Sequence, residues 1–284
     1  MSGQESYLLG LVGAGIGASL TPAMQEREGR AAGLSLVYRL IDMERADGDR
    51  NDLAEVLTWA RRLGFDGVNI THPFKQAVVP LLDELSEDAE DLGAVNTVLF
   101  RDGRMLGRNT DWSGYSRAFR SALPDAVHDR TVLVGAGGAG VAVGYGLLSQ
   151  GAEHVAVLDT EADRAERCTE RLARRFGEDR VSVSDDVEKA LHDAQGVVNA
   201  TPVGMLGHPG SALPTDLLRS DLWVSDVVYF PLETQLVATA RSRGCRVLPG
   251  GGMAVGQAVG AFEYFTGRTP DAARMTRHFE ELTA

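Results

Sequence analysis

Residues 131–140 read Thr-Val-Leu-Val-Gly-Ala-Gly-Gly-Ala-Gly, and residues 155–159 read Val-Ala-Val-Leu-Asp. The pattern predicts a strand, a tight glycine turn, a helix and a second strand with a carboxylate at its tip. Gly135, Gly137 and Gly140 have the spacing of the dinucleotide fingerprint, which needs a sharp turn, close approach to a pyrophosphate and tight helix-to-strand packing. Asp159 stands about where a carboxylate receives a ribose 2′-hydroxyl. The segment therefore predicts a dinucleotide-binding unit, with the phosphates at the amide end of the helix.

Composition narrows the class of protein. With 284 residues, 44% of them apolar and 24% charged, the chain suits a globular protein of two modest domains or one large one. Its net charge of −12 argues against nucleic acid or an anionic membrane as partner. No apolar run reaches the ~18 residues of a membrane span, and residues 1–6 lack the basic start of a secretion signal. We expect a cytoplasmic protein with reduced Cys168 and Cys245 and, because its histidines lack paired spacing, no bound metal.

Lysine is rare in this chain. Of 28 basic residues, only Lys75 and Lys189 are lysines. Lysine can release a proton, whereas arginine effectively cannot, and an alcohol that loses hydride to a nicotinamide must also lose a proton. Lys75 follows a short strand, Val68–Ile70, and a proline-fixed turn, and Asp111 is expected to end another strand of the same domain. We predict that Lys75 and Asp111 are a catalytic pair; which of them takes the proton stays open. The alternative is a surface ion pair worth under about 1 kcal/mol.

A second glycine loop lies near the N-terminus. Gly13, Gly15 and Ala18 fit a looser form of the same fingerprint. Pro22, however, suits the first turn of a helix, which places the helix start several residues after the glycines. The loop thus ends in the hydroxyls of Ser19 and Thr21 beside a helix start, a corner suited to a carboxylate. The alternative, that Thr21 only caps the helix, remains equally open.

Alternation of strands and helices predicts an α/β protein of two domains. Residues 1–111, completed by 253–284, are expected to form a substrate-binding catalytic domain, and residues 112–252 a doubly wound Rossmann domain with a parallel sheet. The C-terminal helices are expected to return to the first domain. We also expect a helix over 76–85, with nearby acids on a solvated face. Polar side chains at turn ends suit a small polyhydroxylated substrate, although each could be an ordinary turn residue; they are Ser19, Thr21, Thr71, Asn96, Asn109 and Gln257.

Several of these motifs together resemble one family, the shikimate dehydrogenases, over essentially the whole chain. They are Ser19-Leu-Thr21-Pro22, Asn69-Ile-Thr71-His-Pro73-Phe-Lys75, Gly93-Ala-Val-Asn96-Thr, Gly107-Arg-Asn109-Thr-Asp111, the glycine loop, Asn199-Ala-Thr201-Pro202-Val-Gly-Met205, Asp226-Val-Val-Tyr229, and Gly252-Met253 with Gln257. The resemblance implies that Lys75 and Asp111 are catalytic, and that Ser19, Thr21 and Tyr229 hold the substrate carboxylate. It implies that Thr71, Asn96 and Gln257 hold ring hydroxyls. The implied cofactor contacts are Gly135, Gly137, Gly138, Ala139, Gly140, Asp159, Arg164, Thr201, Val203, Met205, Val228, Gly252 and Met253.

Two departures from the family pattern bear on cofactor and substrate. Biosynthetic members typically have Asn-Arg-Thr where this chain has Asp159-Thr160, and a carboxylate there repels the 2′-phosphate of NADP. We therefore expect NAD, with NADP less suited, although Arg164 is near and could serve the pyrophosphate or ribose. Thr21 replaces the usual serine, and Met24-Gln25-Glu26 replaces the usual His-Asn. Both departures resemble the NAD-linked branch that oxidises quinate as well as shikimate.

The resemblance thus implies an NAD-dependent oxidation of quinate, shikimate or both to the 3-dehydro acids. An NAD(P)-dependent dehydrogenase of another cyclitol or of an amino-shikimate is the first alternative. A catalytically inactive, cofactor-binding regulatory paralogue is the second, and the presence of both Lys75 and Asp111 speaks against it. The expected partners are the small cyclic acid and the nucleotide, with the chain a monomer or a homodimer.

Overall fold

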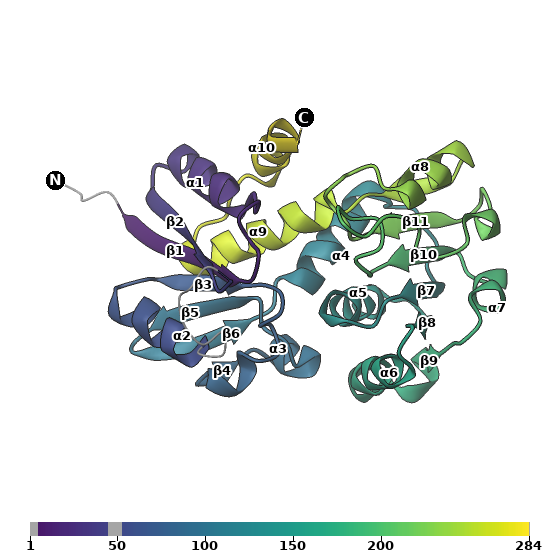
Figure 1. Ribbon diagram of the computed structural model, residues 1–284, viewed down its shortest axis with the longest axis horizontal. Coiled ribbons are helices and arrows are strands. Elements are labelled where there is room, and N and C mark those ends of the chain that lie inside the picture. Colours follow the sequence, from purple (N-terminus) through teal and green to yellow (C-terminus); the bar gives the residue numbers. More distant parts are fainter. Residues whose placement is uncertain (1–4, 45–52, 284) are drawn as a thin grey trace. The chain divides into compact units, whose positions relative to one another are not determined.

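The computed structural model describes residues 5–44 and 53–283 (Figure 1). The chain divides into two compact units. The first contains residues 1–110 and 257–284, and the second contains residues 111–256. Within the described ranges, no helix is both long and apolar enough to cross a membrane.

The first unit is built on a mixed six-stranded sheet in the order β2-β1-β3-β5-β6-β4. Its strands are β1 (Ser6–Gly13), β2 (Ser35–Asp42), β3 (Gly67–Ile70), β4 (Glu84–Leu85), β5 (Thr97–Arg101) and β6 (Arg104–Arg108). Strand β1 is parallel to both β2 and β3, whereas β5 is antiparallel to β3 and β6. The β5–β6 hairpin turns at Asp102 and Gly103, whose φ angles of 50° and 75° fit the two-residue turn that matches strand twist.

Helices cover both faces of this sheet. They are α1 (Thr21–Ala31), α2 (Leu53–Arg62), α3 (Glu87–Leu92), α10 (Ala272–Thr283) and the part of α9 (Gly251–Thr266) from residue 257 onward. On one face, Phe262 and Phe265 of α9 pack into the core formed with Leu9 and Leu36. On the other face, Leu57 of α2 belongs to a separate core. The predicted return of the C-terminal helices to the first unit is confirmed.

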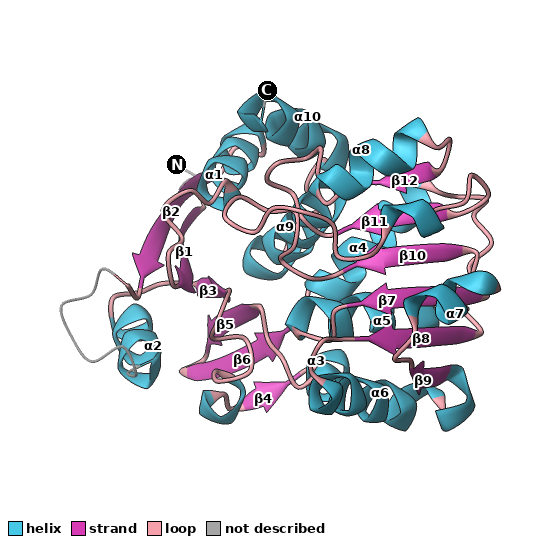
Figure 2. Cartoon of the chain, turned by 45° about the vertical axis from the view of Figure 1, so that its right-hand side comes forward, coloured by secondary structure: helices cyan, strands magenta, loops and turns pink. Residues whose placement is uncertain are grey.

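The second unit contains a parallel six-stranded sheet in the order β12-β11-β10-β7-β8-β9, which can be followed from edge to edge in Figure 2. Its strands are β7 (Arg130–Val134), β8 (His154–Leu158), β9 (Val181–Val183), β10 (Gly196–Asn199), β11 (Trp223–Asp226) and β12 (Arg246–Leu248). The chain starts at the centre of the sheet, winds to one edge and returns to build the other half. This is the dinucleotide-binding strand order, so the predicted doubly wound fold is confirmed.

The helices of the second unit are α4 (Asp111–Ala122), α5 (Gly138–Ser149), α6 (Ala162–Phe176), α7 (Val187–His192), α8 (Gln235–Ser242) and the first residues of α9. On one face of the sheet, α7 and α8 contribute Leu191 and Leu236 to a core with Val132 and Val197. On the other face α5 packs closely: a Cβ on Gly144 would lie 3.4 Å from Leu133 Cδ2. Ligands of such sheets bind where the strands end and the helices begin.

Two local expectations were wrong. Residues 76–85 do not form a helix: after a turn, the segment contains one 3-10 turn (Val79–Leu81) and then β4, which pairs with β6. Pro80 supplies no backbone N–H and disfavours helical geometry before it, and Asp83 instead accepts a hydrogen bond from Met105 N at 2.7 Å. Asp111 does not end a strand but opens α4, three residues after β6 ends.

Candidate active site

The glycine loop after β7 gives each of its three fingerprint glycines a separate role. Gly135 has φ +100°, a left-handed conformation that an L side chain rarely adopts. A Cβ on Gly140 would lie 1.9 Å from the carbonyl oxygen of Gly135, so α5 could not begin this close to the strand. A Cβ on Gly137 would meet no atom within 4 Å. Gly137 therefore leaves open space at the start of α5, and the first turn of α5 contains Gly138 and Ala139.

Asp159 follows β8 directly and is held against this loop. Its Oδ2 accepts a hydrogen bond from the N–H of Ala136 at 2.8 Å, and its Oδ1 accepts one from the N–H of Glu161 at 3.0 Å. The side chain is only 6% exposed. Two backbone N–H groups and strong burial fix the carboxylate at the tip of the strand next to the glycine loop.

Arg164, in the first turn of α6, points its guanidinium to carboxylates. It forms an ion pair with Glu161, and its Nε lies 3.8 Å from Asp159 Oδ1. The arginine side chain is 41% exposed. Its charge is therefore partly satisfied by two acids of the chain itself.

A buried polar network shapes the loops after β10 and β11. Asn199 and Asp226 are register partners at the ends of these parallel strands, and Asn199 Nδ2 donates to Asp226 Oδ1 at 3.0 Å. Asp226 also accepts from the N–H of Val228 and from the hydroxyl of Thr234. Burial raises the pKa of Asp226, and the hydrogen bond from Thr234 acts in the opposite direction.

The same network orders the segment that contains the predicted cofactor contacts Thr201, Val203 and Met205. Asn199 Oδ1 accepts from both the N–H and the hydroxyl of Thr201, and the Thr201 hydroxyl accepts from Val203 N. Met205 and, on the loop after β11, Tyr229 are exposed to 40% and 44%. These loops lie at the carboxyl edge of the sheet, as the glycine loop does.

In the first unit, three loop segments meet at the carboxyl ends of β1 and β3. The N–H of Thr71 donates to Val12 O at 2.9 Å, and the N–H of Ala14 donates to His72 O at 3.1 Å. The carbonyl of Lys75 accepts from Val95 N at 2.8 Å, which fixes its backbone beside Asn96. The turn over 71–75 therefore lies between the N-terminal glycine loop and the start of β5.

A row of buried polar side chains crosses the sheet beneath these segments. The hydroxyl of Tyr38 donates to Asn69 Oδ1 at 2.7 Å, and Asn69 Nδ2 donates to the hydroxyl of Thr97 at 3.0 Å. Thr97 donates in turn to Asn96 Oδ1, which also accepts from the N–H of Thr110 at 2.8 Å. The row holds the backbone immediately before Asp111, and burial raises the pKa of Tyr38.

The N-terminal glycine loop differs from the dinucleotide loop in where its helix begins. Asp42 Oδ1 accepts from the N–H of Gly15 at 3.0 Å, much as Asp159 accepts from Ala136. Helix α1, however, starts only at Thr21, with a proline in its first turn, as predicted. Leu20 is the N-cap residue and no side chain caps the helix, so the interpretation of Thr21 as its cap is wrong. Ser19 and Thr21 stand beside this helix start, where the N–H of Thr21 donates to the hydroxyl of Ser19 at 3.4 Å.

The predicted site residues divide between the units. Ser19, Thr21, Thr71, Lys75, Asn96, Asn109 and Gln257 belong to the first unit, and Asp111, Tyr229, Gly252, Met253 and the residues of the glycine and β10 loops belong to the second. Asn109 is buried, and its Nδ2 donates to Ala94 O. In the described part of the chain, no three His, Cys, Asp or Glu side chains are grouped so as to hold a metal ion.

Sequence reasoning gave no role to Asn199, Asp226 or Asn69. Each is buried and polar at or near the end of an apolar strand. A polar residue in that position was the available signal, because an unpaired buried polar group is unfavourable and must find partners across the sheet. Asn199 and Asp226 order the loops that contain the predicted contacts.

A unit with the dinucleotide-binding strand order, joined in one chain to a second α/β unit, is the architecture of two-domain, nucleotide-linked oxidoreductases. Comparison of the sequence with known protein families identifies the family within this class. Residues 11–98 match the shikimate dehydrogenase substrate binding domain, and residues 250–278 match the shikimate 5′-dehydrogenase C-terminal domain. The chain belongs to the shikimate dehydrogenase family, as the sequence motifs predicted.

Relatives match this chain from end to end. A shikimate dehydrogenase (NADP(+)) of Streptomyces avermitilis is 53% identical, with 98% of this chain and 97% of the relative aligned. A quinate/shikimate dehydrogenase (NAD(+)) of Corynebacterium efficiens is 51% identical over 98% of this chain and 99% of its own. The solved structure of the quinate dehydrogenase from Corynebacterium glutamicum in complex with NAD is 47% identical, with a TM-score of 0.94 and coverage of 98% and 100%.

Proposed function

We propose that this protein catalyses the reversible oxidation of quinate, shikimate or both at a ring hydroxyl, with NAD as the hydride acceptor. The observation that carries the choice of nucleotide is the position of Asp159. Relatives of similar identity are named for NADP and for NAD, so likeness alone does not decide between them. The local chemistry of the ribose site does favour one.

The carboxylate of Asp159 is fixed by two backbone N–H groups at the tip of β8. A ribose 2′-hydroxyl can donate a hydrogen bond to such a carboxylate. A 2′-phosphate would bring a second anion next to it, in a partly buried place where repulsion is weakly screened. Asp159 therefore supports NAD.

Arg164 does not offset this preference. A 2′-phosphate site needs an arginine with its guanidinium available. Here the guanidinium forms an ion pair with Glu161 and lies near Asp159, so a phosphate would have to compete with both carboxylates. Arg164 is better suited to maintaining the local charge balance around the ribose.

The first unit supplies the proposed contacts with a small cyclic polyol acid. Ser19 and Thr21, at the start of α1, would hold its carboxylate, and Tyr229 is proposed as a further contact of that carboxylate. Asn96, Thr71 and Gln257 would hold ring hydroxyls. Hydroxyl and amide groups suit a polyhydroxylated ring, because each hydroxyl needs both a donor and an acceptor.

The proton is proposed to be handled by Lys75 and Asp111. Oxidation of the alcohol transfers a hydride from the ring carbon to NAD, and the hydroxyl proton must pass to a base of the protein. The backbone of Lys75 is fixed by Val95, and the backbone before Asp111 is fixed by Asn96. Val95 and Asn96 are adjacent and directly precede β5. The two anchored backbones favour pre-organised proton transfer.

The direct test is the reduction of NAD measured in parallel with quinate, shikimate and an uncharged cyclitol. We expect turnover with the two acids and little with the cyclitol, because only the acids offer a carboxylate to the corner at Ser19 and Thr21. Preferred turnover of the cyclitol would replace the proposed substrate class. Absence of turnover with any of them, using either nucleotide, would overturn the proposed function.

Replacing Asp159 by serine is expected to shift the nucleotide preference. The ratio of kcat/KM for NAD to that for NADP should fall about 100-fold, because a hydroxyl removes the repulsion and weakens the acceptor for the ribose. Glu161→Gln is the matched control: it releases Arg164 while leaving Asp159 in place, and should raise the use of NADP more modestly. If the wild-type protein uses both nucleotides equally well at equal concentration, the preference for NAD is wrong.

A further inference from the structure

Helix α1 connects the proposed carboxylate corner with the C-terminal helices. Its first residue is Thr21, and Gln25 and Glu28 follow at spacings of four and seven, which places all three on one face of the helix. Gln25 and Glu28 are fully buried, each with 0% of its surface exposed. A buried face of a helix that starts at a ligand site is ordinarily apolar, so two long polar side chains there need a reason.

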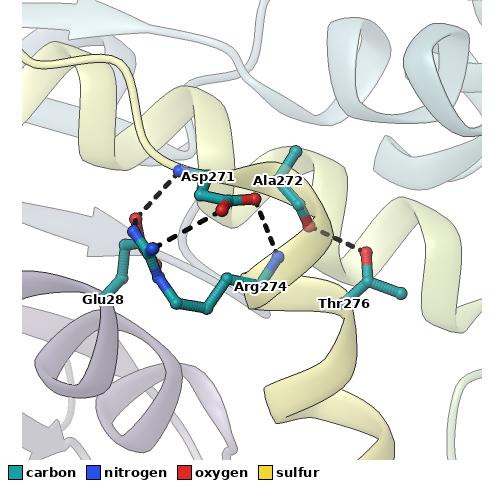
Figure 3. Close-up of polar contacts among 5 residues, drawn as sticks. All are labelled: Glu28, Asp271, Ala272, Arg274 and Thr276. Atoms are coloured by element: carbon teal, nitrogen blue, oxygen red, sulfur yellow. Dashed lines mark hydrogen bonds and ion pairs between the residues drawn. The ribbon is translucent and has the colours of Figure 1, made fainter. Parts of the chain in front are cut away.

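Glu28 is paired with α10 (Figure 3). Its Oε2 accepts from Arg274 Nε at 2.8 Å, and its Oε1 accepts from Arg274 Nη2 at 2.6 Å. The N–H of Asp271 donates to the same Oε1 at 2.9 Å, and Asp271 also lies 3.4 Å from Arg274 Nη1. This bidentate arrangement is specific in direction as well as distance, so it fixes both the rotation of α1 and its position along its axis.

Gln25 makes a second tie, to α9. Its Nε2 donates to the carbonyl of Ala258 at 2.9 Å. Ala258 directly follows Gln257, which is proposed to hold a ring hydroxyl. One hydrogen bond therefore connects the helix that starts at the carboxylate corner with the backbone next to Gln257.

The other polar atom of Gln25 argues against a purely structural role. Among the described residues, Gln25 Oε1 is buried and has no hydrogen-bond partner. An unsatisfied buried oxygen is unfavourable, whereas an apolar side chain of similar size would remove that penalty. Stability alone would thus favour an apolar residue here. An apolar residue, however, would lack the N–H that Gln25 donates to Ala258.

We propose that Gln25 is a positioning residue for the substrate: its hydrogen bond to Ala258, with the Glu28–Arg274 pair as a second tie, sets the spacing between the Ser19/Thr21 corner and Gln257. The inference rests on the proposed function, because the two ends of this spacing are the proposed contacts for carboxylate and ring hydroxyl. A change in spacing weakens the fit of the cyclic acid and leaves the nucleotide site of the second unit untouched.

The test compares Gln25→Met with Gln25→His. Methionine is close in volume and removes both the N–H donor and the unsatisfied oxygen, whereas histidine keeps a ring N–H for Ala258. Arg274→Lys provides an independent variant, since it keeps the charge beside Glu28 but loses the bidentate geometry. Arg27→Gln is the matched control, because Arg27 also joins α1 to α10, through an exposed ion pair with Glu281 at 2.9 Å.

For Gln25→Met we expect KM for the cyclic acid to rise about 10-fold, with KM for NAD and the melting temperature close to those of the wild type. Gln25→His should recover most of the loss, Arg274→Lys should show the same selective rise in KM, and Arg27→Gln should behave as wild type. An unchanged KM in folded Gln25→Met, or in Arg274→Lys should the former not fold, overturns the positioning role while the proposed function stands. A wild-type protein inactive with both acids overturns the two proposals together.

Discussion

Replacement of Lys75 by methionine is expected to lower kcat for oxidation of the cyclic acid by about 10²–10⁴-fold, the usual contribution of a positioned proton-transfer group. Methionine keeps the length of the side chain and removes the group that can hold or release a proton. The hydrogen bond from the N–H of Val95 to the carbonyl of Lys75 does not depend on the lysine side chain, so the turn over 71–75 should persist. Binding of NAD, measured by fluorescence of the reduced nucleotide, should be unchanged because the second unit provides that site.

Lys75→Arg separates proton transfer from charge. Arginine keeps a cation but effectively cannot lose its proton, so it should be nearly as inactive as methionine if Lys75 itself transfers the proton. Activity close to that of the wild type would mean that Lys75 serves only as a cation and that Asp111 takes the proton. In that case Asp111→Asn, which keeps a side chain suited to a helix start, should lose most of the activity.

The chain offers a matched control for this experiment. Lys189, its one other lysine, lies exposed on α7 of the second unit, where its backbone N–H donates to Asp186 Oδ1 at the start of that helix. Lys189→Met should therefore keep full activity. If Lys75→Met also keeps it, Lys75 is not catalytic and the assignment of the pair fails.

Alanine substitutions in the glycine loop are expected to separate folding from nucleotide binding. Gly140→Ala brings a Cβ to 1.9 Å from Gly135 O, so the backbone must shift. We expect a loss of about 1–3 kcal/mol in the free energy of unfolding, together with lost affinity for NAD. Gly137→Ala meets no atom, and its φ of −73° and ψ of −171° suit alanine.

Gly137→Ala should accordingly keep, or raise by up to about 1 kcal/mol, the free energy of unfolding, because it restricts the unfolded chain. Its affinity for NAD should nevertheless fall roughly 10-fold or more, since the methyl group occupies space that the pyrophosphate needs. Urea unfolding and nucleotide titration of the two variants measure the effects separately. Normal NAD affinity in Gly137→Ala would show that the open space at Gly137 is not used by the cofactor.

The second unit was predictable in detail because its determinants are local. The order of strand, glycine turn, helix and strand lies within 30 consecutive residues, and each glycine has a backbone reason that one motif expresses. Strand β8, with Asp159 directly after it, was correctly predicted. The family followed from motifs in a fixed order, since each motif marks a strand end.

The errors arose where tertiary contacts outweighed local preference. Residues 76–85 show a plausible helical pattern, but Asp83 and Met105 exchange hydrogen bonds that draw the segment to the edge of the sheet as β4. Periodicity does not reveal a partner 22 residues away. Thr21 likewise had the residue type of a helix cap, and only the folded backbone placed Leu20 at that position.

The sequence by itself determined the fold class, the dinucleotide loop with Asp159, and the identity of the chemical groups at the strand ends. These follow from short-range patterns, in which residues that are close in the sequence are also close in the structure. Only the tertiary structure decided which buried polar groups pair: Tyr38 with Asn69, Asn199 with Asp226, Glu28 with Arg274, and Gln25 with Ala258. The physical reason is that a buried hydrogen bond joins atoms brought together by packing, and residues 28 and 274 meet only because α10 returns to the first unit.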